Sequence, residues 1–303
     1  FENKNISNFD HSIDRINLPN LSLNKDFVPN LSDLVFLCLP HGVTHNFVKK
    51  LYNKIKIIDL SADFRLDSNK IYSSNYGNNH SCPELLSDFI YGLPEINRKK
   101  IKQFSNISIP GCYPTSILLP LIPLVKDNLI NLKNIIIDSK SGYSGAGKKF
   151  DLSNIKKINE YNFYNYNTNT HRHICEIKQE LDKCTKRELN FSFNPHILPS
   201  FRGMMSTIYC DLETNITSFE IKENLIKFYK DSFFVKFIND DSVFDFFSIQ
   251  NTNNCMIRIF KHHSDSKVII VSLIDNLLKG AAGQAVQCFN ILFDFDENLS
   301  LVN

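Results

Sequence analysis

Glycine is scarce in this sequence: only ten glycines occur among 303 residues, and none precedes Gly42. No glycine-rich turn therefore links a strand to a helix ahead of the first apolar run, which begins near residue 34. Residue 1 is phenylalanine and not methionine. We expect that the chain is a fragment or has lost an opening segment.

An excess of one charge is also lacking. The sequence has 34 basic and 32 acidic residues, a formal net charge of +2, and no dominant basic block. This balance gives no support for a nucleic-acid groove or for binding to an anionic membrane surface. With 43% hydrophobic and 22% charged residues, the composition is that of an ordinary globular protein, and two domains are expected.

The eight cysteines lack the spacing of a metal site. No pair has C-x-x-C spacing, and no Cys/His cluster repeats at the spacing of zinc ligands. No secretory signal opens the chain, so we expect a reducing, cytosolic compartment. The longest uncharged stretch, residues 107–125, contains four prolines that would interrupt a membrane helix. We therefore expect it to be buried protein interior.

The first third of the chain has the pattern of a parallel sheet. Short apolar runs that resemble buried strands are separated by a helical segment, which is typical of a doubly wound α/β fold. The expected elements are residues 34–39 (strand), 44–52 (helix), 55–60 (strand) and 107–109 (strand). The last strand leads through Gly111 and Cys112 into a predicted helix that ends near residue 127.

In the second half, strands follow one another with few helices between them, which favours an α+β domain with an antiparallel or mixed sheet. The expected elements are strands at 134–139, 189–193, 204–212, 255–260 and 268–274, a helix at 218–230 and a small-residue helix at 275–289. We predict an α/β protein of two domains. An incomplete Rossmann-type nucleotide-binding domain comprises residues 1–111 and 276–303, and a catalytic and oligomerisation domain comprises residues 112–275.

Cys112 is the first candidate for chemistry. It lies between Gly111 and Tyr113-Pro114, where a strand ends and an apolar helix begins. Proline is well tolerated in the first turn of a helix. The unpaired N–H groups and the positive dipole end at that position favour a thiolate. The same amides could hold a developing oxyanion. We expect a nucleophile whose thiol pKa is lowered.

Three further segments carry candidate groups. The tripeptide His171-Arg172-His173, followed by Glu176, could supply an acid and base near a thiolate, although the tripeptide alone slightly favours a solvated polar turn. A Gly/Ser loop at residues 141–147 could bring backbone N–H groups against a phosphate. Arg202 lies in a constrained turn and could bind a carboxylate or phosphate.

Taken together, these segments resemble the N-acetyl-γ-glutamyl-phosphate reductases of the semialdehyde dehydrogenase superfamily. The similarity extends from about residue 13 to the C-terminus and rests on eight segments in the same order. They are residues 39–42 (Leu-Pro-His-Gly), 58–65 (Ile-Asp-Leu-Ser-Ala-Asp-Phe-Arg), 91–95 (Tyr-Gly-Leu-Pro-Glu), 110–115 (Pro-Gly-Cys-Tyr-Pro-Thr), 141–147, 171–173, 195–203 and 275–282.

The resemblance implies an NADPH-dependent reductase of an acyl phosphate in arginine biosynthesis, which assembles as a homodimer or homotetramer. Cys112 would displace phosphate to form a thioester that accepts hydride, and His171 would be the acid/base residue, with His173 its competitor. The substrate would contact Tyr166, His173, Glu176 and Arg202. The NADP site would be lined by Pro40, His41, Gly42, Ser61, Ser141, Gly142, Ser144, Gly145, Ala146, Gly147 and Asn276.

Two features depart from the family pattern. Cys175 replaces the usual proline, and the G-x-[TS]-G-x-x-G turn that normally receives the cofactor pyrophosphate has no counterpart. The alternatives are another acyl-phosphate reductase, such as an aspartate-semialdehyde dehydrogenase or an aminoadipyl-phosphate reductase, and a catalytically weak fragment. A cysteine hydrolase that uses Cys112 and His171 is a further alternative from another class.

Overall fold

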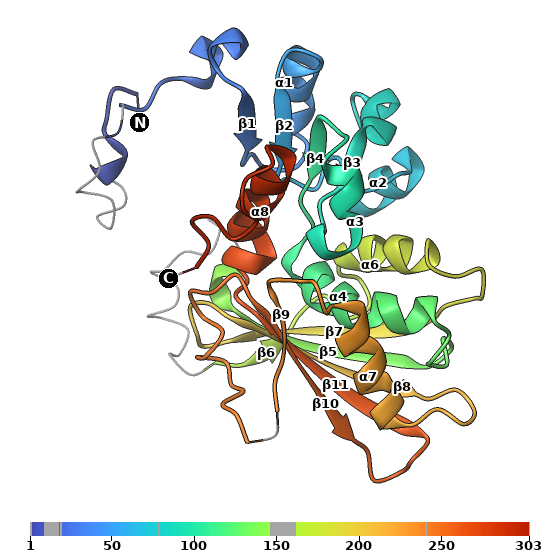
Figure 1. Cartoon of the computed structure of the whole chain (residues 1–303). Helices are drawn as coiled ribbons and strands as arrows, with labels where there is room; N and C mark the ends of the chain where they lie inside the picture. Colours follow the sequence, from blue (N-terminus) through green and yellow to red (C-terminus); the bar gives the residue numbers. More distant parts are fainter. Residues whose placement is uncertain are drawn as a thin grey trace.

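Two sheets organise the chain, with helices between them (Figure 1). The structure is a computed structural model and describes residues 2–8, 18, 20–77, 79–145, 162–239 and 241–302. Within these ranges, no helix is long and apolar enough to span a bilayer.

The first sheet has four parallel strands. Their spatial order is β1 (Leu34–Leu37), β2 (Lys56–Asp59), β4 (Asn106–Ser108) and β3 (Phe89–Tyr91). The helices of this part are α1 (Thr44–Leu51), α2 (Asn69–Tyr76) and α3 (Pro94–Ile101). Short 3-10 turns occur at η1 (Ile6–Asn8), η3 (Asn24–Asp26), η4 (Pro29–Leu31) and η5 (Pro83–Asp88).

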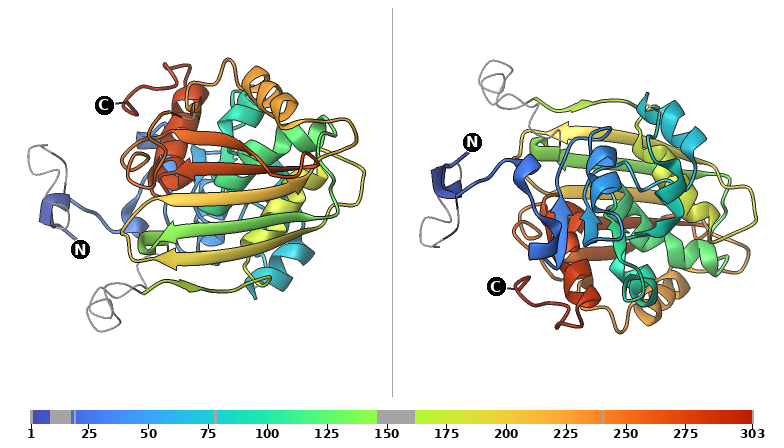
Figure 2. Two further views of the ribbon diagram at one scale, coloured as in Figure 1. Left: turned by 90° about the horizontal axis from the view of Figure 1, so that it is seen from below. Right: turned by 90° about the horizontal axis from the view of Figure 1, so that it is seen from above.

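The second sheet has seven strands and is mixed. Its order is β6 (Tyr164–Asn165), β7 (Phe191–Leu198), β5 (Ile135–Gly142), β8 (Met204–Asp211), β11 (Lys267–Ile274), β10 (Cys255–Lys261) and β9 (Val235–Phe237). The β5–β7 and β9–β10 pairs are parallel and the other neighbours are antiparallel. Helices α4 (Cys112–Lys126), α6 (His173–Asp182) and α7 (Ser218–Phe228) lie on its upper face. Seen from below, the strands lie in front of all these helices (Figure 2).

Helix α4 forms the centre of the core. Every residue from Tyr113 to Val125 is buried, because the helix lies under the first domain and on the second sheet, so the expectation of a buried interior is confirmed. Pro120 and Pro123 lie inside it and cannot donate backbone hydrogen bonds. The Leu119 carbonyl, which Pro123 leaves without a helical donor, accepts from the Tyr229 hydroxyl at 2.6 Å. A side chain of another segment thus compensates one proline.

The C-terminal helix differs from its prediction. The expected continuous helix at 275–289 is a π-helical turn, η7 (Leu278–Ala282), followed by α8 (Gly283–Leu292). Helix α8 packs through Cys288 and Ile291 against the first sheet, where Ile58 and Ile107 meet it. On this packing we propose that residues 276–303 belong with the first domain.

The predicted α/β class, with a parallel sheet and a mixed sheet, is confirmed. All the strands that the sequence predicts occur at or near the expected residues. Strands β3, β6 and β9 and helices α2, α3 and α6 were not predicted, and α6 carries part of the site described below.

Replacing Tyr229 with phenylalanine tests the role of its hydroxyl. Because Tyr229→Phe leaves the buried Leu119 carbonyl without a donor, we expect the free energy of unfolding to fall by about 1–3 kcal/mol. Urea denaturation measures the difference. Tyr164→Phe is the matched control, because Tyr164 is 40% exposed, and its loss should be much smaller. An equal effect of both changes would contradict a special role for the Tyr229 hydroxyl.

Candidate active site

The carboxyl ends of the strands of the first, parallel sheet carry part of the predicted site. The turn at residues 40–42 follows β1, Ser61 follows β2, and Gly111-Cys112 follows β4. Because these strands are parallel and adjacent, the segments that follow them lie along one edge of the sheet, where ligands of open α/β sheets bind.

Cys112 is held in a closely packed position at the start of α4. It is partly buried and is the first residue of the helix, after Gly111. A Cβ atom at Gly280 would lie 2.7 Å from Cβ of Cys112, and one at Gly111 would lie 2.5 Å from Nε2 of His173. Both positions therefore require glycine. The thiol lies where the first domain, α4 and η7 meet.

The pKa of the Cys112 thiol differs from the prediction. Burial raises it to about 11, and the amides of Tyr113 and Cys112 and the charge of Arg65 offset only part of that effect. The expectation of a lowered thiol pKa was therefore wrong for Cys112 in the chain without bound substrate or cofactor. The helix terminus acts as predicted, but the loss of solvent around the sulfur has the greater effect on the thiol pKa.

The two histidines lie beside the cysteine segment. The rings of His171 and His173 are 4.7 Å apart, and each makes an edge contact with the ring of Tyr113. His171 Nδ1 accepts from the backbone N–H of His173, while Nε2 lies 3.4 Å from the Tyr166 hydroxyl. That hydroxyl in turn donates to Tyr113. Nε2 is therefore the ring nitrogen of His171 that faces the Tyr166 hydroxyl.

Both imidazoles are neutral at physiological pH. Burial, with a smaller contribution from the charge of Arg172, lowers the pKa of His171 to about 4. Burial also lowers the pKa of His173 well below its ordinary value. Since Nδ1 of His171 accepts an amide hydrogen, its neutral ring carries the proton on Nε2. The interpretation of this tripeptide as a solvated turn does not fit, because both rings are buried.

Glu176 has a different place from the one predicted. Its side chain has no exposed surface, and Oε1 accepts from the Gly111 amide and from the Tyr91 hydroxyl, each at 2.8 Å. Oε2 lies 3.4 Å from Arg65. A carboxylate buried in this way has no room for a substrate, so the predicted substrate contact is corrected to a contact with the cysteine turn.

Arg202 and Asn276 lie together with the loop after β5. Arg202 forms an ion pair with the buried Asp275 at 2.7 Å and donates to Asn251. Asn276 accepts from the Gly203 amide and donates to Ser144. Substrate binding by Arg202 stays a prediction, since the structure engages two of its nitrogens within the protein.

The Ser141 and Gly142 positions are both buried at the end of β5. The Ser141 hydroxyl donates to the Gly142 carbonyl at 2.9 Å, and a Cβ atom on Gly145 would lie 2.9 Å from the same hydroxyl oxygen. The predicted Ala146 and Gly147 lie outside the described residues.

The carboxylate of Asp63 holds the turn that follows β1. Gly42 has φ 81°, a conformation that favours glycine, and its amide donates to both carboxylate oxygens of Asp63. Asp63 also accepts from the Tyr72 hydroxyl. His41, in the same turn, lies 3.3 Å from Arg172 of the histidine segment. The two domains therefore meet at this turn.

Ser61 does not present its hydroxyl to a ligand. Ser61 Oγ donates to the buried Asp59 carboxylate at 2.7 Å and accepts from the Asp63 amide at 3.1 Å. The predicted cofactor contact through this side chain is thus corrected: the hydroxyl shapes the turn after β2 instead.

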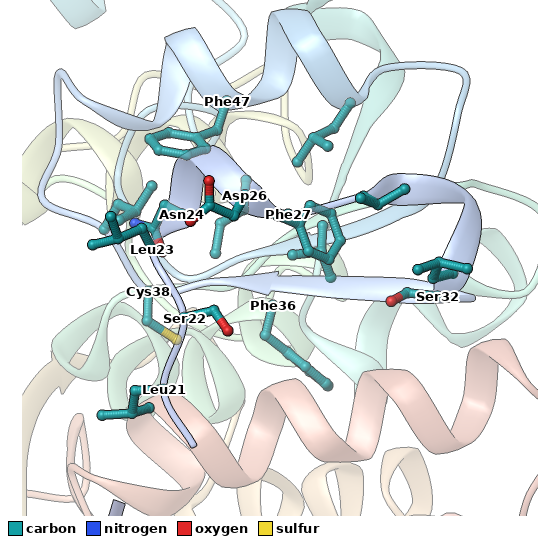
Figure 3. A pocket seen from close by; sticks show the side chains of 16 residues that line it. Leu21, Ser22, Leu23, Asn24, Asp26, Phe27, Ser32, Phe36, Cys38 and Phe47 are labelled. Carbon is teal, nitrogen blue, oxygen red and sulfur yellow. The ribbon is translucent and has the colours of Figure 1, made fainter. Parts of the chain in front are cut away.

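Two cavities bear on the site. One, of about 470 Å³, adjoins the histidine segment, and its lining includes Gly145, Tyr166, His171 and Arg172. A larger one, of about 770 Å³, lies beside β1, where apolar side chains such as Phe27, Phe36 and Phe47 face it (Figure 3). Of the candidate catalytic residues, His171 lines the smaller cavity.

Sequence reasoning missed Arg65, Tyr91 and Asp63, which hold the site together. All three lie in segments that carry the family resemblance, Asp63 and Arg65 in residues 58–65 and Tyr91 in residues 91–95. Their position at the end of a strand (Tyr91) or within six residues after one (Asp63 and Arg65) was the available signal, because these segments lie at the ligand edge of a parallel sheet.

Known protein families match both parts of the chain. The semialdehyde dehydrogenase NAD binding domain matches residues 4–104, and the semialdehyde dehydrogenase dimerisation domain matches residues 112–276. Aspartate semialdehyde dehydrogenase II from Vibrio cholerae has the same fold, with a TM-score of 0.68 at 15% identity over 89% of this chain and 82% of that one. The class is therefore that of the semialdehyde dehydrogenase-type oxidoreductases.

Closer relatives narrow the assignment. An N-acetyl-gamma-glutamyl-phosphate reductase of Ehrlichia canis is 47% identical over 89% of this chain and 78% of its own length. The protein of the same name from Clostridium beijerinckii is 42% identical over 98% of this chain and 86% of its own length. A relative from Oryza sativa, described as probable and chloroplastic, is 41% identical over 97% of this chain and 70% of its own length. The chain belongs to the family of N-acetyl-γ-glutamyl-phosphate reductases.

The raised thiol pKa predicts how Cys112 reacts in the free protein. Since the pKa is about 11, the rate of alkylation by iodoacetamide should rise about tenfold per pH unit between pH 7 and 9.5, with the thiolate fraction. Mass spectrometry of the peptide that contains Cys112 follows the rate at this one cysteine. A cysteine in a short unstructured peptide, with a pKa of about 8.5, is the control. A rate at Cys112 that levels off before that of the control would contradict the dominance of burial.

Proposed function

We propose that this chain reduces N-acetyl-γ-glutamyl phosphate to N-acetylglutamate semialdehyde and phosphate with NADPH, a reaction of arginine biosynthesis. The main support is the juxtaposition of Cys112, at the start of α4, with the buried His171 and His173. The relatives that carry the name of this enzyme support the choice of substrate.

The segments after β1 and β5 fit a dinucleotide. Helix α1 begins at Thr44 directly after the turn at 40–42, and Oγ1 of Thr44 is buried without a hydrogen-bond partner in the described part of the chain. A helix N-terminus with free donors suits a phosphate. We propose that this turn, the loop at residues 141–147 and Asn276 hold NADP(H), and that the cofactor, when bound, supplies the hydride. The preference for NADP over NAD comes from the family resemblance.

Cys112 is the proposed nucleophile. Its sulfur attacks the acyl carbon, a C–S bond forms, and the bond from that carbon to the phosphate oxygen breaks. The thiol is neutral before the attack because its pKa is raised, so its proton leaves during the step, and the departing phosphate can accept it. We propose that the amides at the start of α4 stabilise the charge that develops on the acyl oxygen. After reduction the C–S bond breaks, the aldehyde leaves and the thiol is protonated again.

His171 is the proposed acid/base residue. Its Nε2 carries the proton and lies next to the Tyr166 hydroxyl, on a cavity of about 470 Å³. A neutral imidazole N–H at this position can donate to the acyl oxygen as negative charge develops there. His173 has its ring against Gly111, and we propose that it orients His171 through its backbone amide.

The proposal extends to assembly and compartment. The second domain matches a dimerisation domain, and we propose a homodimer or homotetramer. Its seven-stranded sheet exposes Ile136 and Tyr209, at 44% and 40%, on a face that could contact another copy. The described cysteines form no disulfide with one another, as expected in the proposed cytoplasmic compartment.

Replacing the nucleophile tests the covalent mechanism. Cys112→Ser nearly conserves side-chain size, so we expect an intact fold and a loss of turnover by several orders of magnitude, because a hydroxyl is a much weaker nucleophile here. NADPH oxidation with N-acetyl-γ-glutamyl phosphate measures the loss, and L-aspartyl phosphate serves as the control substrate. Near-normal turnover of the serine variant would exclude the thioester intermediate. A preference for L-aspartyl phosphate would show that the proposed substrate is wrong.

The two histidines can be separated by kinetics. If His171 donates to the reacting oxygen, His171→Asn should lower kcat by about 100-fold or more while the KM for NADPH changes little. His173→Asn is the comparison, and its loss in kcat should be smaller. The reverse order of losses would transfer the acid/base role to His173 and leave the reaction class unchanged.

A further inference from the structure

The backbone before Cys112 is held at both of its ends by one buried ion pair. Arg65 Nε donates to the Ile109 carbonyl at 2.7 Å, and the Gly111 amide donates to Glu176 at 2.8 Å. Arg65 and Glu176 lie 3.4 Å apart, and their side chains are 10% and 0% exposed. The three-residue approach to the cysteine is therefore enclosed between a guanidinium and a carboxylate.

The other contacts of the pair reach the neighbouring strand ends. Arg65 also donates to the Leu60 carbonyl after β2, and Glu176 accepts from the hydroxyl of Tyr91, the last residue of β3. Groups at the end of β3 and in the segments after β2 and β4 thus converge on two charged side chains. Burial of an ion pair is costly unless its remaining donors and acceptors are satisfied, and these contacts satisfy most of them.

Helix α6 links this pair to the histidines. It begins at His173 and carries Glu176 one turn later. Gln179, a further turn along, donates to the Arg65 carbonyl at 3.0 Å and accepts from the Asp67 amide at 2.7 Å. One short helix therefore fixes the histidine segment, the cysteine turn and the loop after β2 relative to one another.

We propose that Glu176 is a positioning residue, which holds the Gly111 amide and thereby places Cys112 against the histidines, with Arg65 as its counter-charge. The proposal rests on Cys112 being the nucleophile of the proposed function. It replaces the substrate contact that the sequence suggested for Glu176. The carboxylate acts through the backbone and does not touch the reacting atoms.

The charge of Glu176 has a second, measurable effect on the thiol. Its negative charge raises the pKa of Cys112, whereas the positive charge of Arg65 lowers it. Glu176→Gln removes the charge but keeps an oxygen that can accept from Gly111. Glu176→Ala removes both. Glu180→Gln is the matched control, because Glu180 is a buried glutamate on the same helix whose carboxylate accepts from Lys183 and Gln179 instead.

The first measurement is the rate of Cys112 alkylation by iodoacetamide against pH, with no substrate or cofactor. Glu176→Gln should shift the midpoint to lower pH, and Glu180→Gln should leave it at the parent value. The second measurement is kcat with N-acetyl-γ-glutamyl phosphate. Glu176→Ala should lower kcat by about 100-fold with little change in KM, as expected for a misplaced nucleophile, and Glu176→Gln should retain more of the parent kcat than Glu176→Ala.

Parent-like alkylation profiles and kcat in both Glu176 variants would overturn the proposal, as would an equal shift in Glu180→Gln. A rise in KM with kcat unchanged would instead support the original prediction that Glu176 contacts the substrate. If the Glu176 variants do not fold, Tyr91→Phe decides, since it removes one partner of the carboxylate and keeps the charge: a lower kcat is expected, and the parent kcat would refute the proposal. Alkylation of Cys112 requires no substrate turnover. It therefore tests the role of Glu176 even if the chain does not catalyse the proposed reaction.

Discussion

The ion pair between Arg65 and Glu176 is the interaction on which the arrangement of this molecule depends. It is buried at the junction of two sheets that share no strand, and the two charges come from different sides of that junction. A single change that removed one partner would leave the other charge uncompensated inside the protein, which is far more costly than the loss of an exposed pair. The relation between the domains is thus fixed where the cysteine turn passes between them.

Close packing also fixes the positions of Cys112 and His173. Gly280 of η7 lies against Cys112, and Gly111 lies against His173, with no space for a side chain in either place. Exclusion of water from this region raises the thiol pKa and lowers the pKa of each imidazole. The resting site therefore contains a neutral thiol and neutral histidines in place of a preformed ion pair. The proposed chemistry then relies on the reactivity of the acyl phosphate and on fixed donors more than on a resting thiolate.

Much of this could be predicted from the sequence. The apolar runs that became β1, β2 and β4 are continuous and end in turn residues, and Cys112 lies between a strand and a helix, so both the sheet and the position of the cysteine were legible. Strand β3 has three residues and helix α6 follows a polar segment, so periodicity gave little signal for either. The π-helical turn at Leu278–Ala282 also resembles an α-helix in sequence.

The errors at the site have one physical cause. Glu176 and Ser61 are residue types that contact ligands, but both are buried and bonded within the protein. The thiol pKa depends on the balance between helix-terminal amides and loss of solvent, and only the first of these is visible in a sequence. Burial is a property of the assembled fold, which brings together segments as distant as Arg65 and Glu176.

The central claim is that Cys112 becomes covalently acylated, and the most direct test is to trap that intermediate. The protein would be mixed with N-acetyl-γ-glutamyl phosphate without NADPH, quenched in acid and digested, and the peptides analysed by mass spectrometry. We expect an N-acetylglutamyl group on the peptide that contains Cys112, which disappears when NADPH is added before the quench. An adduct on another of the eight cysteines, or turnover with no adduct under any condition, would contradict it.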